Sequence, residues 1–169
     1  MNRNCQNKGN ARETANGWLN INESLEWLQG WVSAGYAWCA THFVDRYRRA
    51  DNARGSNLIA IDVDGDTTLA RFWSTDTARH WCAATYTSSS HTEQEHRFRA
   101  IFPLSIQLES TQQHRGAYWL IVDRLLADLG IEKLIDNSGQ KPERLWFGNT
   151  NAEWHVNAEA EPVPDFLLK

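Results

Sequence analysis

Two aspartates, Asp62 and Asp64, stand two residues apart in the largely apolar stretch Leu58–Asp64. Such a stretch is typical of a buried strand, where side chains two residues apart point to the same face, about 7 Å from each other. Carboxylates beside an apolar core are costly unless a cation pairs with them. A divalent metal held by oxygen ligands is the natural partner, so the spacing predicts metal ligands here. The alternative is a strand that runs into an acidic turn at Gly65 and Asp66.

More polar residues suited to the same chemistry follow along the chain. Strands predicted over 81–87 and 98–104 continue the pattern, and their alternation places small polar and basic residues on the face of the aspartates. The residues expected on this face are Asp62, Asp64, Thr87, Ser89, His91, Arg97 and Arg99. Carboxylates bind metal while Arg and His bind polyphosphate, a combination that suits phosphoryl or nucleotidyl transfer. A metal pair normally needs a third carboxylate, and Asp136, which follows Leu134 and Ile135, is the best candidate.

The elements that must position these residues alternate between helices and strands. Apolar residues at helical spacing predict a helix after Asn22, a second over 67–80 and a third over 111–129. Strands outnumber these helices, and the connection between Thr87 and Arg97 is short enough for antiparallel neighbours. The predicted fold class is therefore α+β, with helices packed on one face of a mainly antiparallel sheet.

Composition and charge narrow the classes of function. The 169 residues are enough for one domain, and 41% hydrophobic and 22% charged residues are ordinary for a globular protein. The formal charge of −4 gives no overall basic signature for nucleic-acid binding. Thirteen Arg nevertheless outnumber four Lys, and several Arg lie in the polar connection 45–57. That basic run is either a solvated face or a contact for phosphate or a template strand.

The cysteines and the N-terminus indicate the cellular compartment. Cys5, Cys39 and Cys82 are scattered and odd in number, so they make neither a disulfide framework nor a metal knuckle, and no zinc site is expected. The N-terminal segment is polar and lacks the apolar region of a signal peptide. No run approaches membrane-spanning length. We therefore expect a cytoplasmic protein with no membrane partner.

Taken together, these residues resemble the archaeo-eukaryotic primase superfamily, in its primase-polymerase branch from plasmids, phages and mobile elements. That superfamily has three motifs: an apolar strand that ends in DxD or DxE, a Ser-x-His, and an apolar residue before Asp. The matching segments are Ile61–Gly65, Ser89–His91 and Ile135–Asp136. The phrases Arg97–Leu104 and Pro142–Gly148 also look like the mobile-element version. The resemblance covers roughly residues 30–150, and three motifs in order are more specific than any one of them.

The resemblance implies a fold and a set of roles. The catalytic core would be an RRM-like sheet beside a small N-terminal α/β unit, within a single domain over 1–169. Residues 1–16 would be a flexible lead-in, 17–57 the N-terminal unit and 58–160 the core. Mg²⁺ or Mn²⁺ would be bound by Asp62, Asp64 and Asp136. The catalytic set would be those three acids with His91, and the nucleotide would be bound by Ser89, His91, Arg97, Arg99 and Arg144.

The implied reaction is template-directed attack of a 3′-OH on an α-phosphate with release of pyrophosphate, and also the start of primers from two nucleotides. The implied partners are a DNA template and primer, dNTPs or NTPs, and a helicase or another replication protein. The chain departs from many relatives because it lacks their zinc-binding knuckle. Synthesis of new primers is therefore less certain than extension.

Other functions remain open from the residues alone. A haloacid-dehalogenase-type phosphatase also has DxDG after an apolar strand, with Asp62 as nucleophile, and Asp123 and Asp128 could supply its later acidic pair. Such an enzyme also needs a Lys between these motifs, and the sequence has none there. A non-catalytic RRM-like module would need exposed aromatic residues on its central strands. A replication-origin-binding protein would use the same sheet for metal-independent, sequence-specific duplex binding.

Overall fold

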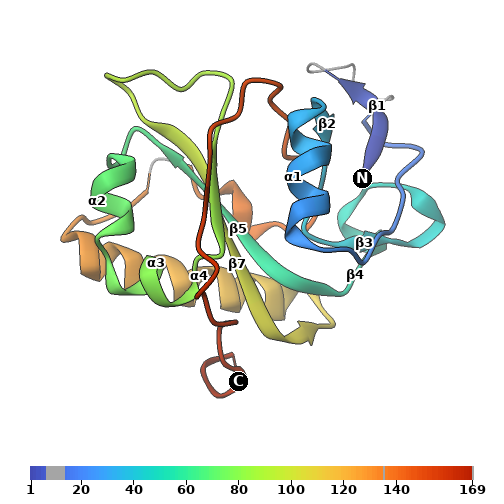
Figure 1. Cartoon of the computed structure of the whole chain (residues 1–169). Coiled ribbons are helices and arrows are strands. Elements are labelled where there is room, and N and C mark those ends of the chain that lie inside the picture. Colours follow the sequence, from blue (N-terminus) through green and yellow to red (C-terminus); the bar gives the residue numbers. More distant parts are fainter. Residues whose placement is uncertain (7–13, 135, 169) are drawn as a thin grey trace.

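The computed structural model describes residues 1–6, 14–134 and 136–168 of the chain, arranged as in Figure 1. The helices are α1 (Leu25–Ser33), α2 (Leu69–Trp73), α3 (Asp76–Trp81) and α4 (Thr111–Leu129). The strands are β1 (Asn2–Gln6), β2 (Tyr36–Ala37), β3 (His42–Phe43), β4 (Ala53–Arg54), β5 (Ser56–Asp64), β6 (Ala84–Thr87), β7 (Arg97–Leu108) and β8 (Trp154–Val156). Single 3-10 turns are η1 (Val44–Arg46), η2 (Ala50–Asn52), η3 (Ser138–Gln140) and η4 (Asp165–Leu167).

The central sheet has the strand order β5-β7-β6-β8, and each pair of neighbours is antiparallel. The predicted α+β class with a mainly antiparallel sheet is therefore confirmed. The longest ladder joins β5 to β7, with Ile59 opposite Phe102 and Asp62 opposite Arg99. Residues directly opposite each other on antiparallel strands point to the same face. The register therefore makes one face of this ladder apolar. On the other face it brings together charged residues of β5 and β7, at the end of β5 that carries Asp64.

One face of the sheet is covered by α2, α3 and α4 and forms the main core. Ile59, Ile61 and Val63 of β5 meet Phe98 and Phe102 of β7 there, and each of the five is at most 1% exposed. Burial of such side chains stabilises a fold by about 1.5–3 kcal/mol each. This core fixes the position of β5, and with it the direction in which the alternate side chains of β5 point.

Local sequence sets both ends of α4. The Ser110 hydroxyl accepts a hydrogen bond from the Gln113 backbone N–H, and the Gln113 side chain accepts one from the Ser110 N–H, which is a capping box. Gly130 ends the helix in the left-handed conformation, at φ 63°. The predicted helix over 111–129 is confirmed. Among the described residues, neither α4 nor any shorter helix has the length and apolar character that a membrane span requires.

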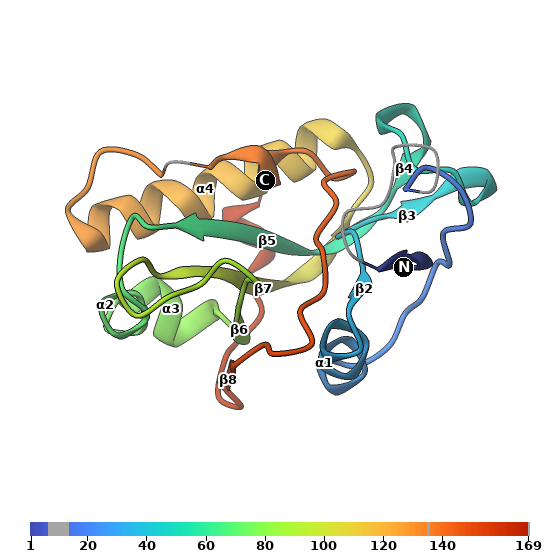
Figure 2. The same ribbon diagram turned by 90° about the horizontal axis from the view of Figure 1, so that it is seen from above.

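A smaller N-terminal unit lies against part of the other face. In Figures 1 and 2 it stands beside one end of β5, and α2 stands beside the opposite end. α1 begins after Ser24, whose hydroxyl accepts a hydrogen bond from the Trp27 backbone N–H. Leu28 and Val32 of α1 then pack in one cluster with Ala60 of β5. Antiparallel ladders β1–β2 and β3–β4 complete the unit.

The start of the chain differs from the expected flexible lead-in over 1–16. Residues Asn2–Gln6 form β1, which pairs with β2, and Thr14 is buried. Residues 7–13 lie outside the described part of the chain. Pairing with Tyr36–Ala37 gives the polar N-terminal segment backbone hydrogen bonds that its side-chain composition does not predict. The division at residues 57 and 58 stays a prediction.

Candidate active site

The two aspartates of β5 face two arginines of β7. Asp62 is directly opposite Arg99 and Asp64 directly opposite Arg97. The Asp64 Oδ1 atom lies 2.9 Å from Arg97 Nε, and Asp62 Oδ1 lies 3.6 Å from Arg99 Nε. The predicted placement of these four side chains on one face is therefore confirmed. The antiparallel register also matches each acid with one arginine.

The third acid, Asp136, comes to the same place from a loop. Arg144 Nη2 lies 3.3 Å from Asp136 Oδ2 and 3.8 Å from Asp62 Oδ2, so one guanidinium stands between the two carboxylates. The other oxygen of Asp136 accepts a hydrogen bond from the Ser138 backbone N–H at 2.7 Å. Ile135, the apolar residue of this motif, lies outside the described residues. The structure thus brings Asp136 beside Asp62, as the motif order predicted.

The loop that carries Asp136 is held from beneath by α4. His114 is buried, and its Nε2–H donates to the Gly139 carbonyl oxygen at 3.1 Å. A Cβ at residue 139 would lie 2.4 Å from the Ala60 carbonyl oxygen and 2.7 Å from the Tyr118 ring. Only glycine allows such a close approach of the loop to β5. The position of Asp136 therefore depends on tertiary packing that the neighbouring sequence does not predict.

Ser89 and His91 enter the site through the turn that follows β6. The His91 N–H donates to the Ser88 carbonyl at 3.1 Å, and the Ser88 N–H donates to the Arg97 carbonyl at 2.9 Å. The His91 Nδ1 atom accepts a hydrogen bond from the Arg97 backbone N–H at 3.0 Å. The neutral ring consequently carries its proton on Nε2, a donor suited to a phosphate oxygen. Ser89 is exposed on the same turn.

One residue expected on this face is placed differently, and another replaces it. Thr87 pairs with Phe98, which points into the core under the helices, and the Thr87 hydroxyl accepts from the Glu153 N–H at 2.9 Å. Tyr86 pairs with Arg99 and therefore faces the acids. Thr87 still lines the cleft, but its position in the ladder does not share the face of the acids. The expected phase was wrong because it was shared with Ser89 and His91, which lie beyond the turn at Ser88.

Arg99 is built into the protein more firmly than the other arginines of the site. Its guanidinium lies 5.5 Å from the Tyr86 ring and 5.6 Å from the Trp146 ring, and it donates to the Phe147 carbonyl oxygen at 2.6 Å. Its side chain is 12% exposed, against 33% for Arg97 and 37% for Arg144. Arg99 thus ties β7 to the 146–147 segment, and Arg97 and Arg144 are the guanidinium groups best exposed to a ligand.

The negative charges are crowded at Asp62. Burial raises the pKa of Asp62, the neighbouring Asp136 and Asp64 raise it further, and Arg99 and Arg144 oppose the rise. The ionised form of Asp62 therefore depends on nearby cations. This balance is typical of a site that gains from an additional positive charge.

The oxygen donors suit Mg²⁺ or Mn²⁺ by their chemistry, but their present arrangement does not. Asp62, Asp64 and Asp136 supply carboxylates alone, the ligand type that hard divalent cations prefer. Within the described residues, however, no three Asp, Glu, His or Cys side chains are grouped closely enough to hold a metal ion. Each of the three acids is instead in an ion pair with an arginine.

All eight predicted site residues line one cleft of about 1250 Å³, here called the acid cleft. They are Asp62, Asp64, Ser89, His91, Arg97, Arg99, Asp136 and Arg144. The volume exceeds that of a typical small-molecule site and leaves room for a nucleotide beside a strand. Sequence reasoning missed Lys141, Glu143 and Phe147, which also line the cleft. In the sequence, only their position after Asp136 and close to Arg144 indicated that these residues could belong to the site.

The basic connection before β5 is tied into the N-terminal unit. Arg48 donates to the carbonyl oxygens of Thr14 at 2.9 Å and Glu143 at 3.0 Å, and Arg49 forms an exposed ion pair with Asp51 at 2.8 Å. Arg48 also lines the acid cleft. Arg48 thus has a structural role, while Arg49 fits the interpretation as a solvated face.

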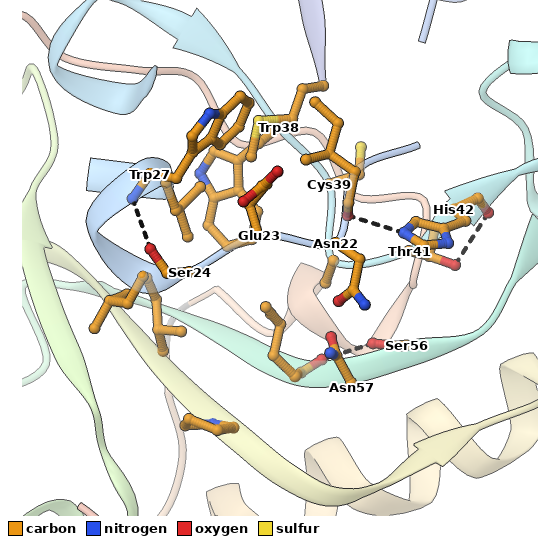
Figure 3. A pocket seen from close by; sticks show the side chains of 18 of the residues that line it. Asn22, Glu23, Ser24, Trp27, Trp38, Cys39, Thr41, His42, Ser56 and Asn57 are labelled. Atoms are coloured by element: carbon orange, nitrogen blue, oxygen red, sulfur yellow. Dashed lines mark hydrogen bonds between the residues drawn. The ribbon is translucent and has the colours of Figure 1, made fainter. Parts of the chain in front are cut away.

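A second cavity of about 340 Å³ lies between α1 and the start of β5. Trp27 and Trp38 line one side of it, and Ser56 and Asn57 line the opposite side (Figure 3). Among the described residues, no Lys or Arg lines this cavity. Met1 and His42 do line it, and it shares no lining residue with the acid cleft.

A known protein family matches most of this chain. Residues 34–163 match the model of the VapE N-terminal domain. Among solved structures, the AEP domain of the cyanophage S-2L primase-polymerase is similar, with 11% sequence identity and a TM-score of 0.49 over 86% of this chain and 76% of that one. None of the curated proteins matches the chain.

The family match spans most of the chain and includes all three motifs. The primase-polymerase resemblance itself rests on those motifs, which all lie within the matched residues. The chain belongs to the VapE N-terminal domain family.

Proposed function

We propose that this chain is a metal-dependent nucleotidyl transferase that extends DNA primers on a template, in the replication of a plasmid, phage or other mobile element. The observation that carries the proposal is the convergence of three acids, two accessible arginines and an Nε2–H histidine in the acid cleft. Carboxylates and phosphate-binding groups that lie side by side in one cleft suit a reaction that needs both a metal and a triphosphate.

In this proposal the chain's own residues bind and orient the nucleotide. Arg97 and Arg144 bind triphosphate oxygens as guanidinium forks, and His91 donates from Nε2. Ser89 adds a hydroxyl from the same turn as His91. Arg99 keeps Tyr86 and Trp146 in place and acts on the nucleotide through its charge. The 3′-oxygen of the primer forms a bond to the α-phosphorus, the bond to the β-phosphate breaks, and pyrophosphate leaves.

Asp62, Asp64 and Asp136 would hold Mg²⁺ or Mn²⁺, which neutralises charge on the attacking and leaving oxygens when bound. Burial, and then the neighbouring Asp136 and Asp64, raise the pKa of Asp62. This supports the role, because an added divalent cation stabilises the ionised carboxylates. The partners in the proposal are a DNA template and primer, a dNTP or NTP, and a helicase or another replication protein.

The phosphatase alternative is less well supported by the same contacts. Its acidic pair would be Asp123 and Asp128, yet both lie on α4, which packs on the opposite face of the sheet from Asp62. Asp128 accepts a hydrogen bond from the Thr77 N–H of α3 at 2.8 Å. These carboxylates therefore stand apart from the nucleophile that they would have to assist.

The RRM-like binding module is also less well supported. Trp154, which is opposite Tyr86 and stacks on its ring at 4.7 Å, and Phe147, which lines the cleft, are half-buried. Tyr86 and Trp146, which contact Arg99, are at most 1% exposed. Both rings are occupied by the Arg99 guanidinium, so they offer no free surface for a stacked base.

Primer extension tests the proposal directly. A labelled primer on a longer template is incubated with dNTPs and Mn²⁺ or Mg²⁺, and the wild type is compared with Asp62→Ala/Asp64→Ala. We expect extension by the wild type and a loss of at least about 10³-fold in the double variant, since a two-metal reaction loses most of its metal site. Asp123→Ala, an exposed acid of α4, is the matched control and should retain activity. Absence of extension by the wild type, or equal extension by the double variant, contradicts the proposal.

A further inference from the structure

The acids of the cleft are already neutralised by arginines of the same chain. Arg144 Nη2 stands between Asp62 and Asp136, at 3.8 and 3.3 Å from their Oδ2 atoms. Arg97 stands between Asp64, at 2.9 Å, and Glu95, at 2.6 Å. The groups proposed to bind phosphate are therefore the same groups that now cover the oxygens proposed to bind metal.

These two arginines are held loosely. The Nε atoms of Arg97, Arg99 and Arg144 are all buried without a hydrogen bond, so other contacts distinguish these arginines. Arg144 has one ring contact, with Trp146 at 5.4 Å, and Arg97 has its ion pairs with Asp64 and Glu95. The two side chains remain about one-third exposed, at 33% and 37%. Arg99 differs because its hydrogen bond to Phe147 and its two ring contacts hold it in place.

The Arg97–Asp64 pair is one-third exposed on both sides, and such pairs contribute little to stability. Asp62 and Asp136 are more buried, at 15% and 28% exposed, so Arg144 can leave them at low cost only when another cation takes its place.

A triphosphate competes well for such arginines. Its oxygens match the guanidinium fork in two-point contacts, as a carboxylate does, and it carries more charge. Movement of Arg144 onto a phosphate would uncover the Oδ2 atoms of Asp62 and Asp136 together, because one Nη2 atom pairs with both, while Arg99 would stay 3.6 Å from Asp62 Oδ1. Movement of Arg97 would uncover Asp64 in the same way.

We propose that Arg144 and Arg97 form a counter-ion latch, which keeps divalent metal off the acids until a triphosphate draws the two arginines away. The latch rests on the proposed function, because it assigns the acids to metal and the arginines to the triphosphate. It makes metal capture and triphosphate binding favour each other, and linkage requires the effect to be reciprocal. It also explains why the three acids do not group into a metal site while their arginines are in place.

Metal titration without nucleotide tests the latch. Free Mn²⁺ is followed by electron paramagnetic resonance with the wild type, Arg144→Gln and Lys141→Gln. Lys141 is the matched control, since it lines the same cleft and carries the same charge but forms no ion pair with the described residues. We expect Arg144→Gln to bind Mn²⁺ about tenfold more tightly than the wild type and Lys141→Gln to differ by less than about twofold. Equal Mn²⁺ affinity in Arg144→Gln and Lys141→Gln overturns the latch.

Two further measurements locate the effect. Addition of Asp136→Asn to Arg144→Gln should remove the gain in Mn²⁺ affinity, and a retained gain would place the metal elsewhere and overturn the latch. Binding of inorganic tripolyphosphate in the presence of EDTA, measured by calorimetry, should weaken at least about tenfold in Arg144→Gln but not in Lys141→Gln. Unchanged tripolyphosphate binding in Arg144→Gln also overturns it.

The test remains decisive if Arg144→Gln does not fold, which its thermal melt will reveal. Arg97→Gln then takes its place against the same Lys141→Gln control, with the same expected gain and the same overturning result. Failure of the latch and failure of the proposed function are distinguishable, because neither titration requires catalysis. If the wild type extends primers but shows no latch in the titrations, only the latch fails. If the titrations show the latch but the chain does not extend primers, only the proposed function fails.

Discussion

The two faces of the central sheet are made from the same strands, yet one is closed and apolar, and the other is open and charged beyond the part that the N-terminal unit covers. Ile61 and Phe98 on the helix-covered face have no exposed surface, whereas the Asp64 and Arg97 side chains on the other face are each 33% exposed. Alternation along β5 and β7 separates the two sets by a single residue. The β5–β7 ladder thus contributes core residues that stabilise the fold on one face and candidate site residues on the other.

The faces are nevertheless connected at the edge of the sheet. α4 belongs to the helix-covered face, but His114 reaches Gly139, and the same loop carries Asp136 into the acid cleft. Along β5, the core residues and the site residues are therefore on separate faces. At η3, however, a residue of the helix-covered face contacts the loop that carries a site residue. The following predictions test this division from its strongest to its weakest consequence.

The largest effect is expected from Phe98→Ala on the helix-covered face. The lost contacts include the edge-to-face pair with Phe72, whose ring centroid is 5.2 Å away, and a cavity would remain. The free energy of unfolding, measured by urea titration, should fall by about 3–5 kcal/mol. Arg97→Ala, one residue earlier and on the open face, should change it far less because water already reaches that side chain. A similar loss in both variants would break the comparison.

An intermediate effect is expected at the edge from Gly139→Ala. The new Cβ meets the Ala60 carbonyl and the Tyr118 ring, so the loop must move away from β5. We expect a loss of about 1–3 kcal/mol in stability, together with at least about tenfold slower primer extension, because Asp136 moves with the loop.

Gly116→Ala on α4 is the control for that substitution. A Cβ there meets nothing within 4 Å, and alanine should stabilise the helix by about 1 kcal/mol. Equal behaviour of the two glycine variants would show that residue 139 does not position the site.

The smallest effect concerns His114 and pH. Burial lowers the pKa of His114 below its ordinary value of 6.5, and the hydrogen bond to Gly139 only partly opposes this shift. The unfolded chain therefore binds more protons in this range, so stability falls as the pH falls from about 6.5 toward the lowered value. Between pH 7.5 and 5.5 the melting temperature of the wild type should drop a few degrees more than that of His114→Gln, which cannot titrate. Parallel melting curves of the two proteins would contradict this assignment.

Much of the charged face could be predicted because it depends on local alternation. Asp62 and Asp64 share a face with Arg97 and Arg99 since each pair lies within one continuous strand. The same logic failed at Thr87, where β6 ends and the chain turns, and it gave no indication that Tyr86 would face Arg99. Period two holds only while the backbone stays extended.

Accessibility could not be predicted for the arginines. Arg97 and Arg99 look equivalent in the sequence, yet Arg99 is held between Tyr86 and Trp146 while Arg97 remains open. Trp146 is far from Arg99 along the chain, so this contact is a product of tertiary packing. The same is true of β1, which pairs with β2 although its composition resembles that of a flexible segment.

The projection of two acids together from a buried strand follows from the sequence, because side-chain direction in an extended chain is a local property. The sequence also placed the three motifs in an order that identified the family resemblance. The tertiary structure alone decided which cation meets each acid and how Asp136 arrives beside Asp62. Those contacts depend on strand register and on a glycine packed against β5, and neither is encoded within a few neighbouring residues.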